Sequence, residues 1–171
     1  VIIRVTTFGE NTEEAVLKAE KIKNQVENCL GEYIIGYNEN RIEDKILELL
    51  RKYNYSIATA ESCTGGMIAA TLVNCSGISS FFNEGIITYS NEAKMKYLQV
   101  SEETLRVHGA VSEETAKEMA EGLLNQTKAD IGVSATGIAG PEGGSETKPV
   151  GLVYIGIAVK DNTFVYELRL N

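Results

Sequence analysis

Ser62 is the residue whose type and position most directly suggest chemistry. It follows a short apolar, β-prone run at residues 56–60 and precedes Gly65 and Gly66, after which a helical pattern begins near Met67. A side chain at such a strand-to-helix turn faces outward at the carboxyl end of a strand, where open α/β sheets keep their sites. The free N–H groups of the first helical turn lie beside it and can receive negative charge. The turn therefore predicts a hydroxyl nucleophile and an anion hole in one place.

Structural roles for the same turn remain open. Ser62 or Thr64 could simply cap the helix, although a cap does not exclude catalysis. Cys63 would be nucleophilic if the helix end lowered its pKa, whereas the simpler alternative is a small buried filler. Glu61 either hydrogen-bonds within the site, orients a partner, or forms an ordinary salt bridge.

A conventional Ser-His-Asp triad is poorly supported because the chain has a single histidine. His108 precedes Gly109, which is predicted to end a helix, and an imidazolium there suits the negative end of the helix. One histidine and no clustered cysteines leave only carboxylates as metal ligands, and no close Asp/Glu cluster stands out. The residues therefore give metal catalysis little support, and the resemblance described below implies no metal or cofactor.

Lys94 is the candidate base that remains. It comes just after a predicted strand at residues 85–90, so it lies near a strand end as Ser62 does, and neighbouring strands would bring the two loops together. A lysine base must be neutral, which at pH 7 costs roughly 4.6 kcal/mol unless the site lowers its pKa from about 10.4. Burial and a nearby cation, for which Lys96 is a candidate, lower such a pKa. The alternative is an ordinary solvated helix lysine.

A glycine-rich loop at residues 136–144 is the third element. It follows a predicted strand at 129–135 and so also lies at a strand's carboxyl end. Its glycines let the backbone approach a ligand closely, and successive N–H groups can form an anion nest. The loop matches neither the Walker pattern nor Gly-x-Gly-x-x-Gly, and a plain flexible turn is the alternative. The glycines are Gly137, Gly140, Gly143 and Gly144.

The elements that must position these residues alternate between strand and helix. The patterns predict strands at 1–7, 33–36, 56–60, 85–90, 129–135, 151–160 and 163–170. They predict helices at 13–30 capped by Thr12, at 42–53, at 67–74, after Asn91, after Ser101, and from Ser112 to about Thr127. Asp161 and Asn162 predict a two-residue hairpin turn. This order predicts a three-layer α/β/α domain with a mixed sheet at 42–171, preceded by a small α+β piece at 1–36 and a linker at 37–41.

Composition excludes several classes of protein. The 171 residues are 43% apolar and carry a net charge of −8, which suits a packed core but not sequence-independent binding of nucleic acid. Residues 1–48 hold six Lys and Arg against ten Asp and Glu and no Gly-x-x-Gly clamp, which argues against RNA binding. No apolar run approaches the roughly 20 residues of a membrane span, and residues 1–7 are too short for a signal peptide. Three cysteines without a metal-type pair suit reduced thiols in a cytoplasmic protein.

Five short motifs in register resemble the CinA C-terminal domain, the nicotinamide-nucleotide amidase (NMN deamidase) family. The resemblance covers roughly residues 42–171. The motifs stand at residues 60–66, 88–94, 108–112, 136–144 and 148–151. Each motif alone is weak, whereas the five together in this order are specific.

The resemblance implies a serine amidase with a lysine partner that converts nicotinamide mononucleotide to nicotinate mononucleotide and ammonia. The family's nucleophile falls on Ser62, its catalytic lysine on Lys94 and a supporting tyrosine on Tyr89. Thr136 matches a hydroxyl position beside the reacting group. The positions expected to contact substrate are Glu61, Thr64, Gly65, Gly66, Thr136, Gly137 and Gly140.

Residues 1–36 are similar to the KH-like connecting module of longer family members. The resemblance implies a further N-terminal domain, and beyond residue 171 a Gly-Asp/Asn-Arg segment and a last helix; both edges of the chain look like cuts in a longer protein. We expect a homo-oligomer, specifically a dimer. The alternative function is a non-catalytic nucleotide-binding or assembly module of a multidomain protein.

Overall fold

The computed structural model describes residues 2–37 and 41–170. In chain order the elements are α1 (Thr12–Leu30), η1 (Gly31–Tyr33), α2 (Ile42–Tyr53), β1 (Ile57–Glu61), α3 (Met67–Val73), η2 (Ile78–Ser80), β2 (Phe82–Ile87), α4 (Asn91–Leu98), α5 (Glu102–Val107), α6 (Glu113–Thr127), β3 (Ile131–Gly137), β4 (Leu152–Val159) and β5 (Asn162–Arg169). The chain divides into two compact units, Val1–Lys45 and Ile46–Asn171, and each is described by itself.

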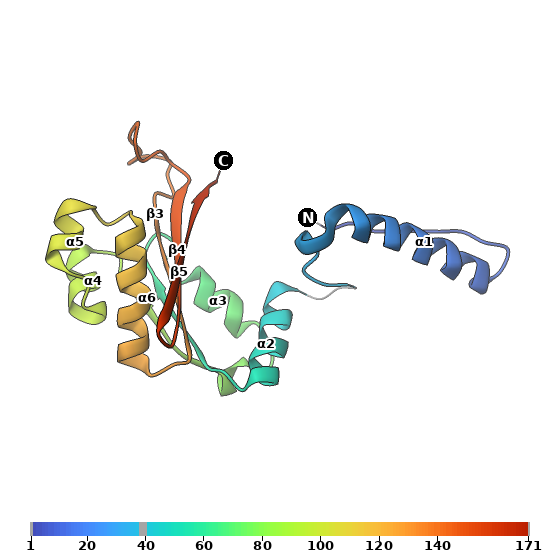
Figure 1. Ribbon diagram of the computed structural model, residues 1–171, viewed down its shortest axis with the longest axis horizontal. Coiled ribbons are helices and arrows are strands. Elements are labelled where there is room, and N and C mark those ends of the chain that lie inside the picture. Colours follow the sequence, from blue (N-terminus) through green and yellow to red (C-terminus); the bar gives the residue numbers. More distant parts are fainter. Residues whose placement is uncertain (1, 38–40, 171) are drawn as a thin grey trace. The chain divides into compact units, whose positions relative to one another are not determined.

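The first unit contains the long helix α1 (Figure 1). The helix confirms the prediction for residues 13–30, but its N-cap is Asn11 rather than Thr12, because the Asn11 side chain accepts the N–H of Glu14 at 2.9 Å. The predicted strands at 1–7 and 33–36 are wrong: the described residues of both segments are irregular or, at Gly31–Tyr33, a 3₁₀ turn. A strand is stabilised by backbone hydrogen bonds to a neighbouring strand, and the described part of this unit offers none. The KH-like α+β interpretation is therefore not confirmed, and residues 38–40 of the predicted linker lie outside the described residues.

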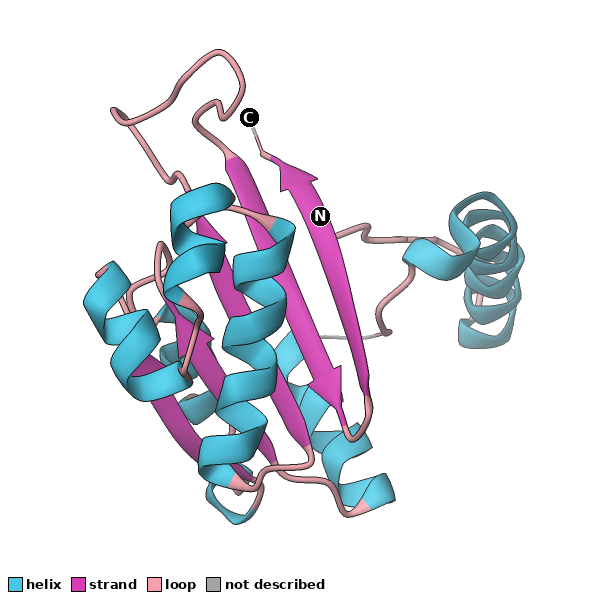
Figure 2. Cartoon of the chain, turned by 60° about the vertical axis from the view of Figure 1, so that its left-hand side comes forward, coloured by secondary structure: helices cyan, strands magenta, loops and turns pink. Residues whose placement is uncertain are grey.

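The second unit is built on a mixed sheet (Figure 2). Among the described residues the strand order is β2-β1-β3-β4-β5, with β1 parallel to both β2 and β3, and with β4 and β5 added antiparallel. Helices α4, α5 and α6 cover one face, and α2 and α3 lie on the other. The predicted three-layer α/β/α domain with a mixed sheet is confirmed.

Two apolar cores flank the sheet. One lies between the sheet and α4, α5 and α6, and its buried members are Ala58, Ala60, Leu98, Val100, Leu105, Met119, Leu123 and Ala129. The other lies toward α2 and α3, with Leu47, Leu50, Ile57, Leu72, Cys75 and Ile78. Every residue of β1 is buried, since this strand has a neighbour on each side and a helix layer on each face. The end of β1 is therefore a rigid platform for the turn that follows it.

Several predicted boundaries shift by a few residues because pairing, not apolar content, sets strand limits. The strand predicted at 85–90 is Phe82–Ile87, and the one predicted at 129–135 is Ile131–Gly137. Val159 pairs with Asn162, so the hairpin turn is Lys160 and Asp161 rather than Asp161 and Asn162. Helix α4 is capped by Ser90 rather than Asn91, because the Ser90 side chain accepts the N–H of Ala93 at 3.1 Å. The predicted caps Ser101 and Ser112 are confirmed.

We predict that Gly122→Ala destabilises the domain although alanine is the better helix former by about 1 kcal/mol. A Cβ at this position of α6 would overlap the backbone carbonyl of Leu98 at the end of α4. Overpacking of this kind costs typically about 1–3 kcal/mol, and the obstacle here is backbone that cannot rotate away. We therefore expect the upper part of that range, and urea unfolding should show a net loss of about 1–2 kcal/mol after the gain in helix propensity. Asn125→Ala, on the exposed side of the same helix, is the control and should be neutral or slightly stabilising; equal effects of the two changes would contradict the packing described.

Candidate active site

The carboxyl end of β1 is held by both of its neighbours. The N–H of Ser62 donates to the carbonyl of Ala135 on β3 at 2.9 Å, and the N–H of Thr88, just after β2, donates to the carbonyl of Glu61 at 2.8 Å. Ser62 therefore sits where the ends of three parallel strands meet. This is the edge of the sheet at which α/β proteins keep their sites.

Ser62 and Lys94 are brought together at this edge. Lys94 Nζ lies 2.9 Å from Ser62 Oγ, and the two residues are only 1% and 8% exposed, respectively. Nζ also donates to the backbone carbonyls of Thr88 at 2.9 Å and Tyr89 at 3.3 Å. Lys94 is the fourth residue of α4 and closes its first turn. The hydroxyl and the amine therefore come from segments that follow different strands, as the sequence predicted.

Burial lowers the pKa of Lys94 from its ordinary value, and the nearby Cys63 thiol works in the opposite direction. The three contacts of Nζ are all with uncharged oxygens. An ammonium would donate one hydrogen to each of them. A neutral amine would keep two hydrogens on the carbonyls and turn its lone pair to the hydroxyl hydrogen of Ser62. The site can therefore hold the free amine that a general base requires.

Lys96 does not supply the cation that was predicted to lower this pKa. Its Nζ lies 4.8 Å from the centre of the Tyr97 ring, and burial is the dominant cause of the shift at Lys94. The correction follows from the helix period, since residues two apart on a helix point in different directions.

Glu61 occupies the anion hole that the sequence predicted beside Ser62. Its carboxylate, 1% exposed, accepts the N–H groups of Gly66 at 3.0 Å, Ile68 at 3.0 Å and Ala69 at 2.8 Å. These are the N–H groups at the start of α3, and the helix dipole stabilises a carboxylate placed there. The prediction that these groups are free to receive a ligand's charge is therefore wrong for Gly66, whose N–H is bonded to Glu61.

The other hydrogen-bond donors in the turn have local or weak acceptors, or none. The N–H of Gly65 donates to the carbonyl of Ser62 at 3.1 Å. The N–H groups of Cys63 and Thr64 approach the sulfur of Cys63, a weak acceptor. The hydroxyl oxygen of Thr64 is buried and has no hydrogen-bond partner among the described residues. Burial raises the pKa of the Cys63 thiol, which disfavours the thiolate that a cysteine nucleophile would need.

Tyr89 and Thr136 contact the site differently from what was predicted. Tyr89 contributes its backbone carbonyl to Lys94, while its side chain is 75% exposed. Thr136, at the end of β3, is buried, and its hydroxyl donates to the carbonyl of Ala110 at 2.6 Å. The hydroxyl of Thr136 therefore fastens β3 to the turn between α5 and α6.

The glycine-rich loop is fixed at its base and exposed beyond it. The N–H of Gly151 donates to the carbonyl of Ile138 at 2.8 Å, which closes the base, and residues 139–147 are exposed. Gly140 has a φ of 77°, a conformation that favours glycine, whereas Gly137 lies in β3 packed against the backbone of Leu152. The loop thus extends from the same edge of the sheet as Ser62.

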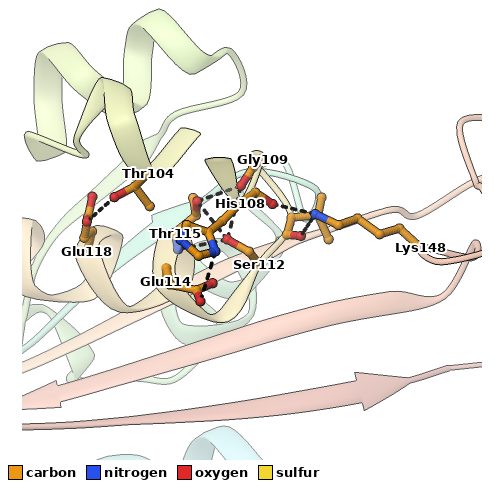
Figure 3. Close-up of polar contacts among 9 residues, drawn as sticks. Thr104, His108, Gly109, Ser112, Glu114, Thr115, Glu118 and Lys148 are labelled. Atoms are coloured by element: carbon orange, nitrogen blue, oxygen red, sulfur yellow. Dashed lines mark hydrogen bonds and ion pairs between the residues drawn. The ribbon is translucent and has the colours of Figure 1, made fainter. Parts of the chain in front are cut away.

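Two contributions to this edge were not predicted from the sequence. The carbonyl of Thr88 accepts from Lys94, and the ammonium of Lys148 donates to the carbonyls of His108 and Val111 at 2.6 and 2.7 Å. Backbone acceptors leave no signal in a sequence, whereas Lys148 lies within one of the five motifs without an assigned role. His108 ends α5 as predicted, and its Nδ1 lies 3.1 Å from Glu114 (Figure 3).

Among the described residues, no helix has the length and apolar character needed to traverse a lipid bilayer. Comparison with protein families matches residues 39–171 to the family described as the CinA C-terminal domain. The CinA-like protein of Kosmotoga olearia is 52% identical over 170 residues, which are 99% of this chain and 41% of that protein. The CinA-like protein of Dictyoglomus thermophilum is 46% identical over 170 residues with the same coverage. The chain thus spans about two fifths of the length of these curated relatives.

Solved structures give the same result. The competence/damage inducible protein CihA of Agrobacterium tumefaciens superposes with a TM-score of 0.74 and 42% identity, covering 75% of this chain and 79% of that one. A competence-damaged protein (CinA) superfamily protein of Escherichia coli has a TM-score of 0.74 and 31% identity, covering 83% and 86%.

We predict that the stability difference between the wild type and Lys94→Met depends on pH. Because burial lowers the pKa of Lys94, the unfolded state binds more protons at this site than the folded state does between the two pKa values. The free energy of unfolding of the wild type, relative to the variant, should therefore rise with pH from the folded pKa toward the ordinary value of 10.5 and be flat below the folded pKa. Urea unfolding at several pH values measures the difference, and a difference that is constant throughout would contradict the lowered pKa.

A second prediction concerns the cap on α3. Glu61→Ala leaves three N–H groups in a buried turn without their acceptor, and each unsatisfied group costs about 1–3 kcal/mol. We expect the free energy of unfolding to fall by at least about 2 kcal/mol, and by less in Glu61→Gln, which keeps one acceptor oxygen. Glu103→Ala, which removes an exposed carboxylate paired with Arg106, should change it by no more than about 0.5 kcal/mol. A loss in Glu61→Ala as small as in this control would refute the cap.

Proposed function

The chain belongs to the CinA C-terminal domain family, and we propose that it is an amidohydrolase that deamidates nicotinamide mononucleotide to nicotinate mononucleotide and ammonia. The observation that carries the proposal is the buried 2.9 Å contact between Lys94 Nζ and Ser62 Oγ. A lysine with a lowered pKa beside a serine hydroxyl is an arrangement that activates a nucleophile. In this proposal Ser62 is the nucleophile and Lys94 the general base.

The first half of the reaction forms an acyl-enzyme. Ser62 Oγ attacks the carboxamide carbon of the nicotinamide ring while Lys94 Nζ takes the hydroxyl proton. The tetrahedral intermediate then collapses, the C–N bond breaks, and the ammonium of Lys94 returns the proton to the departing nitrogen, which leaves as ammonia. The carbonyls of Thr88 and Tyr89 hold Nζ in line with Oγ throughout.

The second half is hydrolysis of the ester. Lys94, again neutral, takes a proton from a water molecule whose oxygen attacks the acyl carbon. The C–O bond to Ser62 breaks, the proton passes to Oγ, and nicotinate mononucleotide leaves. No metal enters this scheme, because the amine supplies both the base and the acid.

Stabilisation of the oxyanion is assigned to donors that Glu61 does not use. The N–H of Thr64 and the unpartnered Thr64 hydroxyl adjoin Ser62 and are the candidates within the turn. The start of the glycine-rich loop, after Thr136, is the other candidate. A well-placed donor of this kind commonly contributes about 3–4 kcal/mol to transition-state stabilisation. Tyr89 is assigned a supporting role through its backbone carbonyl, which accepts a hydrogen bond from Lys94 Nζ.

We predict that the purified protein, with any sequence that flanks these 171 residues, releases ammonia from nicotinamide mononucleotide. Ser62→Ala and Lys94→Met should each reduce kcat by at least about 10³-fold with the fold retained, because each removes a member of one catalytic unit. Enzyme-coupled ammonia detection and chromatography of nicotinate mononucleotide measure the reaction, and circular dichroism checks the fold.

Two controls separate this mechanism from its rivals. Cys63→Ala should keep most of the turnover, since burial raises the pKa of that thiol, and Ser79→Ala, at an exposed serine, should keep all of it. Undiminished turnover in Ser62→Ala would reject the assigned nucleophile. Binding of the mononucleotide without any release of ammonia would favour the non-catalytic nucleotide-binding module instead.

A further inference from the structure

Several backbone carbonyl groups in the turn between α5 and α6 accept hydrogen bonds from side chains. The hydroxyls of Ser112 and Thr115 donate to the carbonyl of Gly109, at 3.1 and 2.8 Å. The Thr136 hydroxyl takes the carbonyl of Ala110. The carbonyls of His108 and Val111 accept from Lys148, and that of Ser112 accepts the N–H of Ala116 in α6. The turn is therefore held from one side by Ser112 and Thr115 at the start of α6, and from the other by Thr136 and Lys148.

Lys148 is the cation in this arrangement (Figure 3). The half-buried side chain reaches across so that Nζ donates to the carbonyl of His108 at 2.6 Å and to that of Val111 at 2.7 Å. Two of its three N–H groups are thus used by neutral oxygens, and within the described residues neither a carboxylate nor a third acceptor contacts Nζ. Gly109, with a φ of 76°, leaves the space beside the ammonium open, since a Cβ there would lie 3.3 Å from Nζ.

Several charged side chains near this edge already have partners. Glu114 pairs with His108, and Arg169, at the end of β5, pairs with Glu167 at 2.8 Å. Lys94 is engaged with Ser62. Lys148 is therefore a cation held in a defined position with its charge not neutralised by a contacting acid, in a chain whose net charge is −8.

A continuous series of contacts connects this cation to the nucleophile. Ser62 is bonded to Ala135, the next residue Thr136 is bonded to Ala110, and the carbonyl of Val111 accepts from Lys148. The hydroxyl and the ammonium consequently belong to the same edge of the sheet, with the base of the glycine-rich loop beside both.

We propose that Lys148 binds the phosphate of the mononucleotide substrate through its remaining N–H, with the glycine-rich loop covering the phosphate from the other side. This inference rests on the proposed function, because it deepens the recognition of that same substrate. The two carbonyls hold the ammonium in place before the ligand arrives, which limits the entropy lost on binding. A charge-assisted hydrogen bond to a phosphate oxygen is among the stronger contacts available to a lysine. Glu142 and Glu146 lie on the exposed part of the loop and would have to point away from the bound anion.

The test combines one substitution, Lys148→Met, with a comparison of two substrates that differ only in the phosphate. Lys148→Met and the wild type are assayed with nicotinamide mononucleotide and with nicotinamide riboside, which has the same amide but no phosphate. The inference predicts that Lys148→Met raises KM for the mononucleotide roughly 10- to 100-fold with kcat nearly unchanged, and leaves kcat/KM for the riboside within about 3-fold. Equal losses with the two substrates would show that Lys148 only fastens the turn, and would overturn the inference.

Two matched variants control for charge and for a rival cation. Lys117→Met makes the same change in net charge at an exposed residue of α6 and should leave both substrates unaffected. Arg169→Met removes the other cation at this edge and should alter KM for the mononucleotide by less than about 3-fold. A large effect of Arg169→Met together with a silent Lys148→Met would also overturn the inference.

The inference can be separated from the proposed function. If the wild type hydrolyses neither substrate, calorimetric titration with the mononucleotide and with inorganic phosphate is carried out on the wild type and Lys148→Met. Binding of both ligands that weakens at least about 10-fold in the variant would support Lys148 as the phosphate site while rejecting the amidase. Binding that is unchanged in the variant, or absent from the wild type, would reject the phosphate site.

Discussion

The buried contact between Ser62 and Lys94 is the interaction on which this account depends. An amine removed from water favours its neutral form, and here its three hydrogen-bond partners are oxygens without charge. A carboxylate in the same place would restore the ammonium and remove the base. The backbone carbonyls of Thr88 and Tyr89 accept hydrogen bonds from the amine, and because they carry no charge they do not restore the ammonium form. The geometry therefore gives a buried amine its hydrogen-bond acceptors while leaving it free of the ion-pair partner that would hold it protonated.

The surrounding fold keeps these two atoms in place. β1 lies inside the sheet, and its end is bonded to β2 and β3, which fixes the backbone of Ser62. Lys94 is positioned by α4, and Gly122 lets α6 approach the end of α4 closely. Glu61 then anchors the first turn of α3 from a buried position next to the nucleophile. The carboxylate beside the reacting serine thus accepts three backbone N–H groups at the start of α3, which stabilise its charge by hydrogen bonding.

The alternation of strand and helix patterns predicted the fold class, and the hairpin predicted the mixed sheet. The positions of Ser62 and Lys94 after strands indicated that the two would meet if those strands were neighbours. Three features could not be predicted from the sequence, for physical reasons. A helix N-terminus looks vacant in a sequence, yet Glu61 fills it because its side chain turns back onto α3. The contribution of Tyr89 to Lys94 is a backbone carbonyl, which any residue could supply. The alternating residues at 1–7 read as a strand, but strands depend on partners, and the described residues of that unit provide none. The catalytic roles themselves stay predictions.

The most direct test is covalent labelling with a fluorophosphonate, which reacts with activated serine hydroxyls, followed by peptide mass spectrometry. The account predicts modification at Ser62, at a rate that rises with pH through the lowered pKa of Lys94 and collapses in a variant without that amine. Labelling of Cys63 instead, or labelling of Ser62 at a rate indifferent to the presence of Lys94, would contradict it.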